Sequence, residues 1–510
     1  MSLMNIRFGS ALLVLVLAWL ILVGVSGTTL TISPTIWQDE VQIVEYGRTS
    51  LAGSNQGWGF NWTSGGQAKP LWSFAGAALQ EKAFQYGNMA GVRWASIVGA
   101  ILASLTLLGW LVSRRVVPIV ALAAAALFLF DPLFTASYRG ARVDALAMAL
   151  MFAAFWLVHL NLSQEKWPVL GSQAHLVGAG VFVGLAGLVW TPFVLLLPLL
   201  VHEVFAKARV GVDSNILIFK QASVNLMVIA LTAAVTMLLA TVLFFGKSSI
   251  HVFVDLIETV TRQVGKGSSP EASFFSELNR LARVFMISPW LPLAAGVALI
   301  LSRRLWLSLW VIFVFVVVLL THTYTHRVIY VLPYLVLGIA LFSDFVYRAK
   351  ERPQFRPIWI SALLVGLVLW AVILSLGART WVAISQSDVR SPALITSLAE
   401  TMIGEGGHKV YVEPWAFYYS GRDLGWQMYK WFDEPSEAEW RELASSMDYL
   451  IFSPRGIEPA RREFLFSLGF SEDVLKLGFD AVDKDSQEVV TRRLYGKGFG
   501  REFVLFKRID

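Results

Sequence analysis

The chain has 510 residues, of which 56% are apolar and only 15% are charged, and its mean hydropathy is +0.60. A soluble globular domain carries about 25% charged residues, so this composition excludes an ordinary soluble protein. The sequence has no cysteine, which excludes disulfides and thiolate metal sites. The net charge of +6 comes without a basic tail or a nucleic-acid-binding motif, and we therefore expect no nucleic-acid partner.

Long apolar runs separated by short polar pieces predict a polytopic α-helical membrane protein with about eleven transmembrane helices. Only helices satisfy the backbone over such lengths in lipid. The first run lacks a small-x-small cleavage site and is expected to be an uncleaved anchor. The predicted spans are residues 10–30, 94–113, 116–131, 145–161, 174–190, 192–206, 222–245, 284–301, 305–321, 328–347 and 358–376.

Clusters of Lys and Arg predict the orientation of these spans in the cell membrane. We expect all four clusters at the cytoplasmic face, with the amino terminus inside. The loops 31–93 and 246–283 are then extracytoplasmic. The second loop is rich in Gly and Ser, and we expect it to be mobile and to close over the site. The clusters are "SRR" (113–115), "AKAR" (206–209), "SRR" (302–304) and "YRAKERPQFR" (347–356).

Polar residues become frequent after residue 377, which predicts a transmembrane catalytic domain over 1–377 and an extracytoplasmic α/β domain over 378–510. The stretch "EPWAFYYSGR" (413–422) offers aromatic faces suited to sugar or lipid contact, although a packed core strand is the more common reason for such a pattern. Predicted strands are "KVYVEP" (409–414), "DYLIFS" (448–453) and "REFVLFKR" (501–508), and a predicted helix is "EAEWRELASSM" (437–447).

Charged residues avoid the middles of the spans and gather at their outer ends. If the topology holds, four groups share one level at the outer membrane–water boundary and line a single cavity. These groups are Asp39 and Glu40 after the first span, Lys69 in the first outer loop, Arg139, Arg142 and Asp144 in "YRGARVDAL", and His322, His326, Arg327 and Tyr330 in "THTYTHRVIY".

Simpler interpretations of these residues stay open at this point. Arg139 fits a side chain that only reaches to lipid headgroups. The pair Arg142 and Asp144 fits a surface ion pair, and the acids after the first span fit a polar patch that ends a helix. His322 and His326 have the i, i+4 spacing of a metal site on a helix, but a third ligand is not obvious.

An outward cavity with acids on one wall and bases on another suits a sugar carried on a polyprenyl phosphate. Cationic side chains would bind the lipid phosphate and offset the charge that grows on it as it leaves. A carboxylate opposite would accept the proton of an acceptor hydroxyl as that hydroxyl attacks the anomeric carbon. Because glycosyl phosphates leave well, a separate general acid is not required.

These motifs resemble those of the GT-C superfamily of membrane glycosyltransferases, in particular the bacterial branch related to protein O-mannosyltransferases and the aminoarabinose transferase of lipid A. The "DE" pair at residues 39–40 is similar to the hallmark of that family, and the resemblance covers most of residues 10–350. The second Pro of the family's Lys-Pro-Pro-Leu motif is absent. Further matching segments are "AKPLWSF", the stretch "EKAFQYGNMAGVRW" with an Arg opening the second span, "FDPLFTASYRGARVDALAMAL" and "HRVIYVLPYLVLGIA".

The resemblance implies roles for individual residues. Asp39 would be the catalytic base of an inverting transferase, and Glu40 would orient or tune it. Arg142 and Asp144 would support the pocket. The donor phosphate would be bound by Lys69, His326, Arg327 and Tyr330. The implied partners are a polyprenyl-phosphate-linked sugar, an extracytoplasmic protein, lipid or glycan acceptor, and the bilayer; no cofactor is expected, and a divalent metal stays open because some superfamily members use one.

Two other classes of function remain as alternatives. A transporter or flippase for a lipid-linked sugar would place ionisable groups and broken helices near the bilayer centre, often within inverted repeats. In this sequence the middles of the spans are almost uncharged, and no repeat is found. A non-catalytic membrane scaffold is the other alternative. Replacing Asp39 by Asn separates the three, because only an enzyme loses turnover and still binds its donor.

Overall fold

The computed structural model describes residues 3–34, 36, 38–52, 60–61, 74–160, 173–210, 214–245, 270–320, 325–348, 357–431, 436–453, 456–476 and 502–509. Most of these residues are helical. The helices of the amino-terminal part are α1 (Leu3–Thr29), α2 (Gln38–Ala52), α3 (Phe74–Ser113), α4 (Pro118–Phe130), α5 (Pro132–Arg139), α6 (Asp144–His159), α7 (Ala174–Val189), η2 (Thr191–Leu196), α8 (Leu197–Ala208), α9 (Asn215–Phe245), α11 (Pro270–Phe285), α12 (Trp290–Leu301), α13 (Leu305–Leu320), α14 (Thr325–Val328), η4 (Ile329–Val331), α15 (Leu332–Arg348), α16 (Pro357–Val372), the π-helical η5 (Ile373–Gly377) and α17 (Ala378–Ser385).

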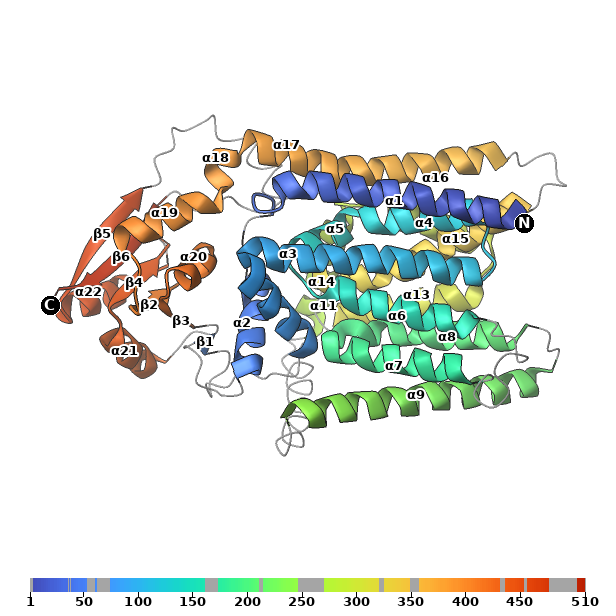
Figure 1. Ribbon diagram of the computed structural model, residues 1–510, viewed down its shortest axis with the longest axis horizontal. Helices are drawn as coiled ribbons and strands as arrows, with labels where there is room; N and C mark the ends of the chain where they lie inside the picture. Colours follow the sequence, from blue (N-terminus) through green and yellow to red (C-terminus); the bar gives the residue numbers. More distant parts are fainter. Residues whose placement is uncertain are drawn as a thin grey trace.

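The long apolar helices lie side by side along the long axis of the molecule, and a smaller domain sits beyond one end of the bundle (Figure 1). Six helices of the described part are long and apolar enough to cross a membrane, and eight are if each of two bent pairs forms one span. Three further apolar helices are shorter. The protein is therefore a polytopic membrane protein, but the predicted number of eleven spans is not confirmed.

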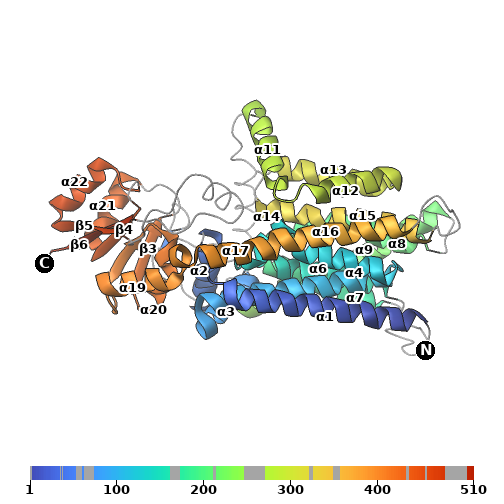
Figure 2. The same ribbon diagram turned by 90° about the horizontal axis from the view of Figure 1, so that it is seen from above.

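The predicted loop 246–283 is partly helical. Residues 246–269 lie outside the described residues, whereas Pro270 begins helix α11. This helix is bent by 101° from α12 and projects away from the bundle (Figure 2). The described part of this loop is therefore helical, and the expectation that the loop closes over the site stays a prediction.

The basic clusters meet at the end of the bundle opposite the smaller domain. Arg348 of α15 donates to the backbone carbonyl of Arg115, and Arg114 at the end of α3 pairs with Glu203 of α8. Glu203 is fully buried and also accepts from Trp110 (2.9 Å) and contacts His159 (2.7 Å). The ends of α3, α6 and α8 are therefore tied together by one buried carboxylate.

The smaller domain holds a six-stranded mixed sheet in the order β1-β3-β2-β4-β6-β5. Strands β1, β3, β2 and β4 are parallel, and β6 pairs antiparallel with both β4 and β5. The three predicted strands and the predicted helix are present, whereas β1, β3 and β5 were missed. The elements are β1 (Phe60–Asn61), α18 (Ser387–Arg390), α19 (Pro392–Met402), β2 (Lys409–Val412), η6 (Trp415–Phe417), α20 (Tyr418–Asp423), β3 (Gln427–Trp431), α21 (Glu437–Ser446), β4 (Tyr449–Phe452), α22 (Pro459–Ser467), β5 (Phe470–Lys476) and β6 (Glu502–Arg508).

Strand β1 comes from the first long loop, yet it extends the sheet of the carboxy-terminal domain. Phe60 is in register with Lys430 of β3, and Asn61 with Trp431. The loop after α2 therefore contributes an edge strand to a sheet that is otherwise built from residues more than 300 positions later in the chain.

The two faces of the sheet pack against different partners, as the alternation of side chains along a strand requires. Tyr411 and Leu450 point into a core with Trp440 of α21. The opposite face belongs to a core that is shared with the membrane-proximal helices α2 and α3. Its members include Val41, Val44, Phe84, Met89, Val92, Ile395, Val410, Phe417, Tyr418, Tyr419 and Leu505.

Helix α2 lies close against the outer part of α3. A Cβ added to Gly47 would stand 1.9 Å from the carbonyl oxygen of Ala77, so only glycine permits this approach. Helix α3 itself is interrupted at Gly87 and Asn88, where the backbone leaves helical geometry and Asn88 has φ 50°. The outer limb of α3, residues 74–86, packs with α2, and the inner limb, residues 89–113, runs into the bundle.

Candidate functional site

The turn between α1 and α2 is held by two buried arginines. Arg93 donates to the carbonyls of Leu30 (2.6 Å) and Pro34 (2.7 Å). Arg139 donates to the carbonyl of Ser33 at 2.8 and 3.1 Å. Helix ends leave carbonyls without helical partners, and cations near a helix carboxyl end are stabilised by its dipole. The two side chains therefore fix the direction in which the chain leaves α1.

Helix α2 begins directly after this turn with Gln38, and Asp39 and Glu40 stand in its first turn. Acidic residues are favoured at this position because the amino end of a helix carries partial positive charge. Their side chains have different surroundings. The Asp39 side chain is 21% exposed, whereas the Glu40 side chain is fully buried.

Asp39 forms an ion pair with Arg142, which lies between α5 and α6. The Arg142 Nε also donates to Asp144 Oδ2 at 2.6 Å, and Ser137 donates to the same oxygen at 3.2 Å. Arg142 lies over the ring of Trp190 at 5.2 Å. Its guanidinium therefore bridges one fully buried carboxylate and one that is partly accessible.

The segment before Arg142 is shaped by local contacts. Asp131 caps α5 by accepting from the backbone amides of Leu133 (2.9 Å) and Phe134 (3.3 Å), which starts a new helix at Pro132 and bends the chain by 55°. The turn at Ala141 is held by Gln80 of α3, which donates to its carbonyl at 3.0 Å.

The electrostatics of this pair favour a carboxylate that accepts protons. Burial raises the pKa of Asp39, Arg142 lowers it and Asp144 raises it, with a net result above the ordinary value. Burial lowers the pKa of Arg142, but Asp144 and Asp39 more than offset this, so Arg142 stays charged. A raised pKa makes Asp39 a stronger base than an ordinary aspartate.

Glu40 has a different set of partners from Asp39. Its two oxygens accept from Arg93 Nε (2.9 Å) and Nη2 (2.8 Å), and Oε1 also accepts from the hydroxyl of Tyr419 (3.0 Å). Glu40 therefore joins α2 to α3 and to the carboxy-terminal domain.

Of the predicted phosphate-binding residues, the structure describes some in full and others only in part or not at all. Tyr330 of η4 is fully buried and interacts electrostatically with Asp144 and Arg142. Arg327 lies in α14, one turn before it, and is partly buried. For His326 only the backbone, within α14, is described. The side chain of His326, and Lys69 and His322 as a whole, lie outside the described residues.

Two of the simpler interpretations are wrong. Arg139 does not reach to lipid headgroups, because its side chain is fully buried and bonded to the end of α1. Arg142 and Asp144 are not a surface pair, since both are buried. Neither burial was visible in the sequence, where the two arginines differ only by their place in "YRGAR".

No group of three His, Cys, Asp or Glu side chains within the described ranges is arranged to hold a metal ion. The side chains of the predicted His322/His326 pair are not among those described, so metal binding stays an open expectation.

No family model matches the chain, and no curated protein matches it in sequence. Solved structures match it in fold. ArnT from Cupriavidus metallidurans bound to undecaprenyl phosphate has 12% identity and a TM-score of 0.54, over 97% of this chain and 97% of that chain. The apo state of the same protein has 13% identity and a TM-score of 0.53, over 98% of each chain. The apo oligosaccharyltransferase of Archaeoglobus fulgidus has 14% identity and a TM-score of 0.47, over 87% of this chain and 69% of that chain.

The match to ArnT extends over both the helical bundle and the carboxy-terminal domain, because it covers nearly the whole of each chain. This agrees with the resemblance that the sequence motifs carry, and this chain has the same fold as ArnT.

Proposed function

We propose that the protein is an inverting glycosyltransferase that moves a sugar from a polyprenyl-phosphate donor to an acceptor on the extracytoplasmic face of the membrane. The observation that carries this proposal is the Asp39–Arg142 pair: a partly accessible carboxylate of raised pKa, held by a buried cation where α2 leaves the bundle. The shared fold with ArnT, whose structure holds undecaprenyl phosphate, supports the class of donor.

In the proposed reaction Asp39 accepts the proton of an acceptor hydroxyl. The hydroxyl oxygen forms a bond to the anomeric carbon, and the bond from that carbon to the phosphate oxygen breaks. The electron pair leaves with the polyprenyl phosphate, and the configuration at the anomeric carbon inverts. Lys69, His326, Arg327 and Tyr330 are the proposed phosphate-binding residues, and a divalent ion that assists them stays open.

Arg142 has two functions in this proposal. It holds the Asp39 carboxylate in one orientation through a charge-assisted bond. Its Nη2 atom is buried and has no hydrogen-bond partner among the described residues, so it supports a role as donor to an oxygen of the substrate. Asp144 fixes the guanidinium from the other side.

The same geometry supports the proposed orientation. The Asp39 site and the sheet domain lie at one end of the bundle, and the basic clusters lie at the other (Figure 1). Basic residues favour the cytoplasmic side. We therefore place the site and the carboxy-terminal domain outside and the amino terminus inside.

Asp39→Asn in proteoliposomes tests the function. Undecaprenyl-phosphate-linked sugars are offered one at a time with an envelope extract as acceptor source, and released undecaprenyl phosphate is measured by mass spectrometry. We expect release to fall by about 10²–10⁴-fold, as when a general base is removed, with undecaprenyl phosphate still bound. The matched control Asp473→Asn changes an exposed aspartate on β5 and should leave release unchanged. The proposal is contradicted if Asp39→Asn releases as much undecaprenyl phosphate as the wild type. It is also contradicted if the protein moves the lipid-linked sugar across the bilayer without releasing the phosphate.

A further inference from the structure

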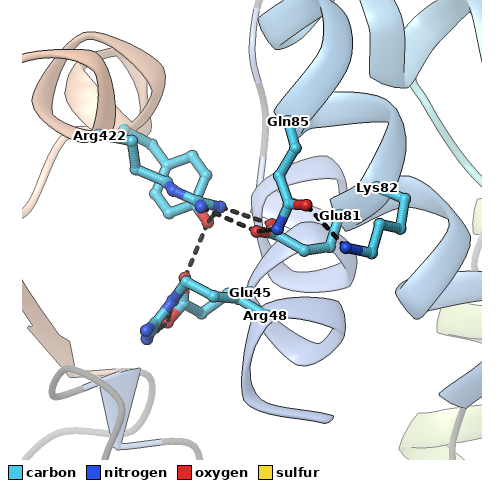
Figure 3. Close-up of polar contacts among 7 residues, drawn as sticks. Glu45, Arg48, Glu81, Lys82, Gln85 and Arg422 are labelled. Carbon is cyan, nitrogen blue, oxygen red and sulfur yellow. Dashed lines mark hydrogen bonds and ion pairs between the residues drawn. The ribbon is translucent and has the colours of Figure 1, made fainter. Parts of the chain in front are cut away.

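Helix α20 of the carboxy-terminal domain carries three side chains that reach the membrane-proximal helices. Tyr419 donates to Glu40 at 3.0 Å, and Tyr418 donates to Glu45 at 2.8 Å. Arg422 donates to both oxygens of Glu81 at 2.6 and 2.9 Å. Figure 3 shows Arg422 on one side facing Glu81 and Glu45 on the other. Two of these carboxylates belong to α2, the helix that carries Asp39, and the third belongs to α3.

All three carboxylates are buried: Glu40 is 0% exposed, Glu45 2% and Glu81 1%. A buried charge is costly unless it is paired and hydrogen-bonded. Glu40 is paired by Arg93 and Glu45 by Arg48, both from the membrane part. Within the described residues, Glu81 forms its ion pair with Arg422 of α20. Removing α20 would therefore leave this acid uncompensated.

Apolar and aromatic contacts reinforce these bonds. The ring of Tyr419 stacks on Phe84 of α3 with centroids 5.6 Å apart, and the Arg422 guanidinium lies 4.1 Å over the same ring. At the edge of the interface, Asn88 donates to Asp423 at 3.1 Å. Together with the shared core, these contacts make α20 part of one packed unit with α2 and the outer limb of α3.

The position of α2 decides where the Asp39 carboxylate points, because Asp39 lies in its first turn. Glu40 is the next residue along the chain and is fixed by α3 on one side and α20 on the other. Glu45 is fixed by α20 one to two turns later. Two anchor points along a helix fix both its tilt and its rotation about its axis.

We infer that α20 is a positioning element for the catalytic base: the carboxy-terminal domain holds α2 in register through Tyr418, Tyr419 and Arg422, so that the Asp39 carboxylate meets the substrate. This inference rests on the proposed function. The domain is then required for turnover rather than for donor binding. Tyr418, Tyr419 and Arg422 are positioning residues, since each acts through a glutamate and not on the substrate.

The first test uses Arg422→Gln, with Lys82→Gln as matched control. Both variants remove one positive charge beside the same turn of α3, but Lys82 is exposed and donates to Gln85 rather than to a buried carboxylate. Because small misplacements of a reacting group are costly, we expect Arg422→Gln to lower kcat by about tenfold at unchanged affinity for undecaprenyl phosphate. Lys82→Gln should stay within about twofold of the wild type. A normal kcat with a raised KM for the acceptor overturns the inference, because the domain then acts in acceptor binding.

The second test restores the interface without the charge. The chain has no cysteine, so Asn88→Cys/Asp423→Cys in the Arg422→Gln background carries the only two thiols. A short bis-maleimide then tethers α20 to α3. We expect the tether to return kcat to within about twofold of the wild type, whereas the untethered variant stays slow. A properly folded, tethered protein that remains slow overturns the inference.

Hydrogen exchange of the amides in 38–52 separates this inference from the proposed function, since it needs no activity. Arg422→Gln should speed exchange in α2, the tether should reverse the effect, and Lys82→Gln should not cause it. If exchange responds in this way but the wild type releases no polyprenyl phosphate, the proposed function fails and the docking stands. If α2 does not respond while the wild type is active, the positioning role fails alone. Tyr419→Phe, which keeps the ring, gives a milder variant with the same expected direction in both measurements.

Discussion

Arg139 donates two hydrogen bonds to the backbone carbonyl of Ser33, although 106 positions separate the two residues in the chain. The same guanidinium donates to Ser26 (3.0 Å) and Thr29 (2.8 Å) in the last turns of α1. The direction in which the chain leaves the first membrane span, and with it the start of α2, is thus set from α5.

Arg139→Met should therefore lower both stability and turnover. The variant leaves several buried acceptors without a donor, each at a cost of about 1–3 kcal/mol. We expect a loss of about 3 kcal/mol and at least a tenfold lower kcat. Thermal unfolding in detergent and product release measure the two effects. Arg139→Lys keeps the charge but loses the several donors of the guanidinium, so its stability and kcat should lie between those of the wild type and of Arg139→Met. Wild-type stability of Arg139→Met would contradict this role.

The pH dependence of the reaction should respond in opposite directions to changes at Arg142 and Asp144. Asp39 acts in its deprotonated form, so kcat/KM rises with pH through the pKa of Asp39. Arg142 lowers that pKa, and Arg142→Gln should shift the rising limb to higher pH. Asp144 raises it, and Asp144→Asn should shift the limb to lower pH. Both variants should also lower the maximal rate.

The measurement is kcat/KM as a function of pH for the wild type and both variants. If both variants shift the rising limb in the same direction, a group other than Asp39 titrates in this limb. The same conclusion follows if the residual activity of Asp39→Asn still shows the limb.

Gly47→Ala should displace α2 from α3. The new Cβ would meet the Ala77 carbonyl oxygen at 1.9 Å, a distance that real Cβ atoms do not adopt. Overpacking typically costs about 1–3 kcal/mol, and we expect a loss at the upper end of that range together with a clear drop in kcat. Gly27→Ala in α1 is the matched control, since nothing lies within 4 Å of its Cβ. Thermal unfolding and product release should separate the pair, and equal behaviour of the two variants would mean that α2 and α3 need not approach so closely.

The buried cluster at the far end of the bundle should contribute to stability alone. Glu203→Gln leaves Arg114 without its carboxylate, and breaking a buried pair in this way costs about 3–5 kcal/mol. We expect a lower unfolding temperature but an unchanged kcat per folded molecule, because the cluster lies at the opposite end from Asp39. Active-enzyme titration with thermal unfolding checks this. A changed kcat would imply coupling along the bundle.

Much of the fold could be predicted from local pattern. The apolar runs gave helices at every predicted span, because helix formation in lipid depends on length and hydropathy. The strands β2, β4 and β6 are dense in β-branched and aromatic residues and were predicted, whereas "QMYKW" of β3 and "FSEDVLK" of β5 are mixed in polarity and were missed.

The site could be predicted in part. Asp39, Arg142 and Asp144 were chosen from their place at span ends, and the structure brings them together. The partners of Glu40 could not be predicted, because Arg93 and Tyr419 lie 53 and 379 positions away. Only the tertiary fold brings such residues into contact.

The stretch 413–422 shows how tertiary packing decides between local alternatives. Its aromatic residues suggested sugar contact or a core strand, yet residues 415–417 form the 3₁₀ helix η6 and 418–423 form α20. Tyr418 and Tyr419 are buried, so the packed-core part of the alternative was right and the strand was wrong. Hydrogen bonds to buried glutamates fix this helix, and no local pattern encodes them.

The interruption of α3 at Gly87 and Asn88 has a consequence for how this helix responds to changes in bilayer thickness. Membrane-spanning helices adapt to thicker or thinner bilayers by tilting. In a straight, uninterrupted helix of 40 residues, every change of tilt would displace the outer end sideways. A joint between the two limbs allows the outer limb, with Glu81 and Phe84, to keep its contacts with α20 while the inner limb tilts.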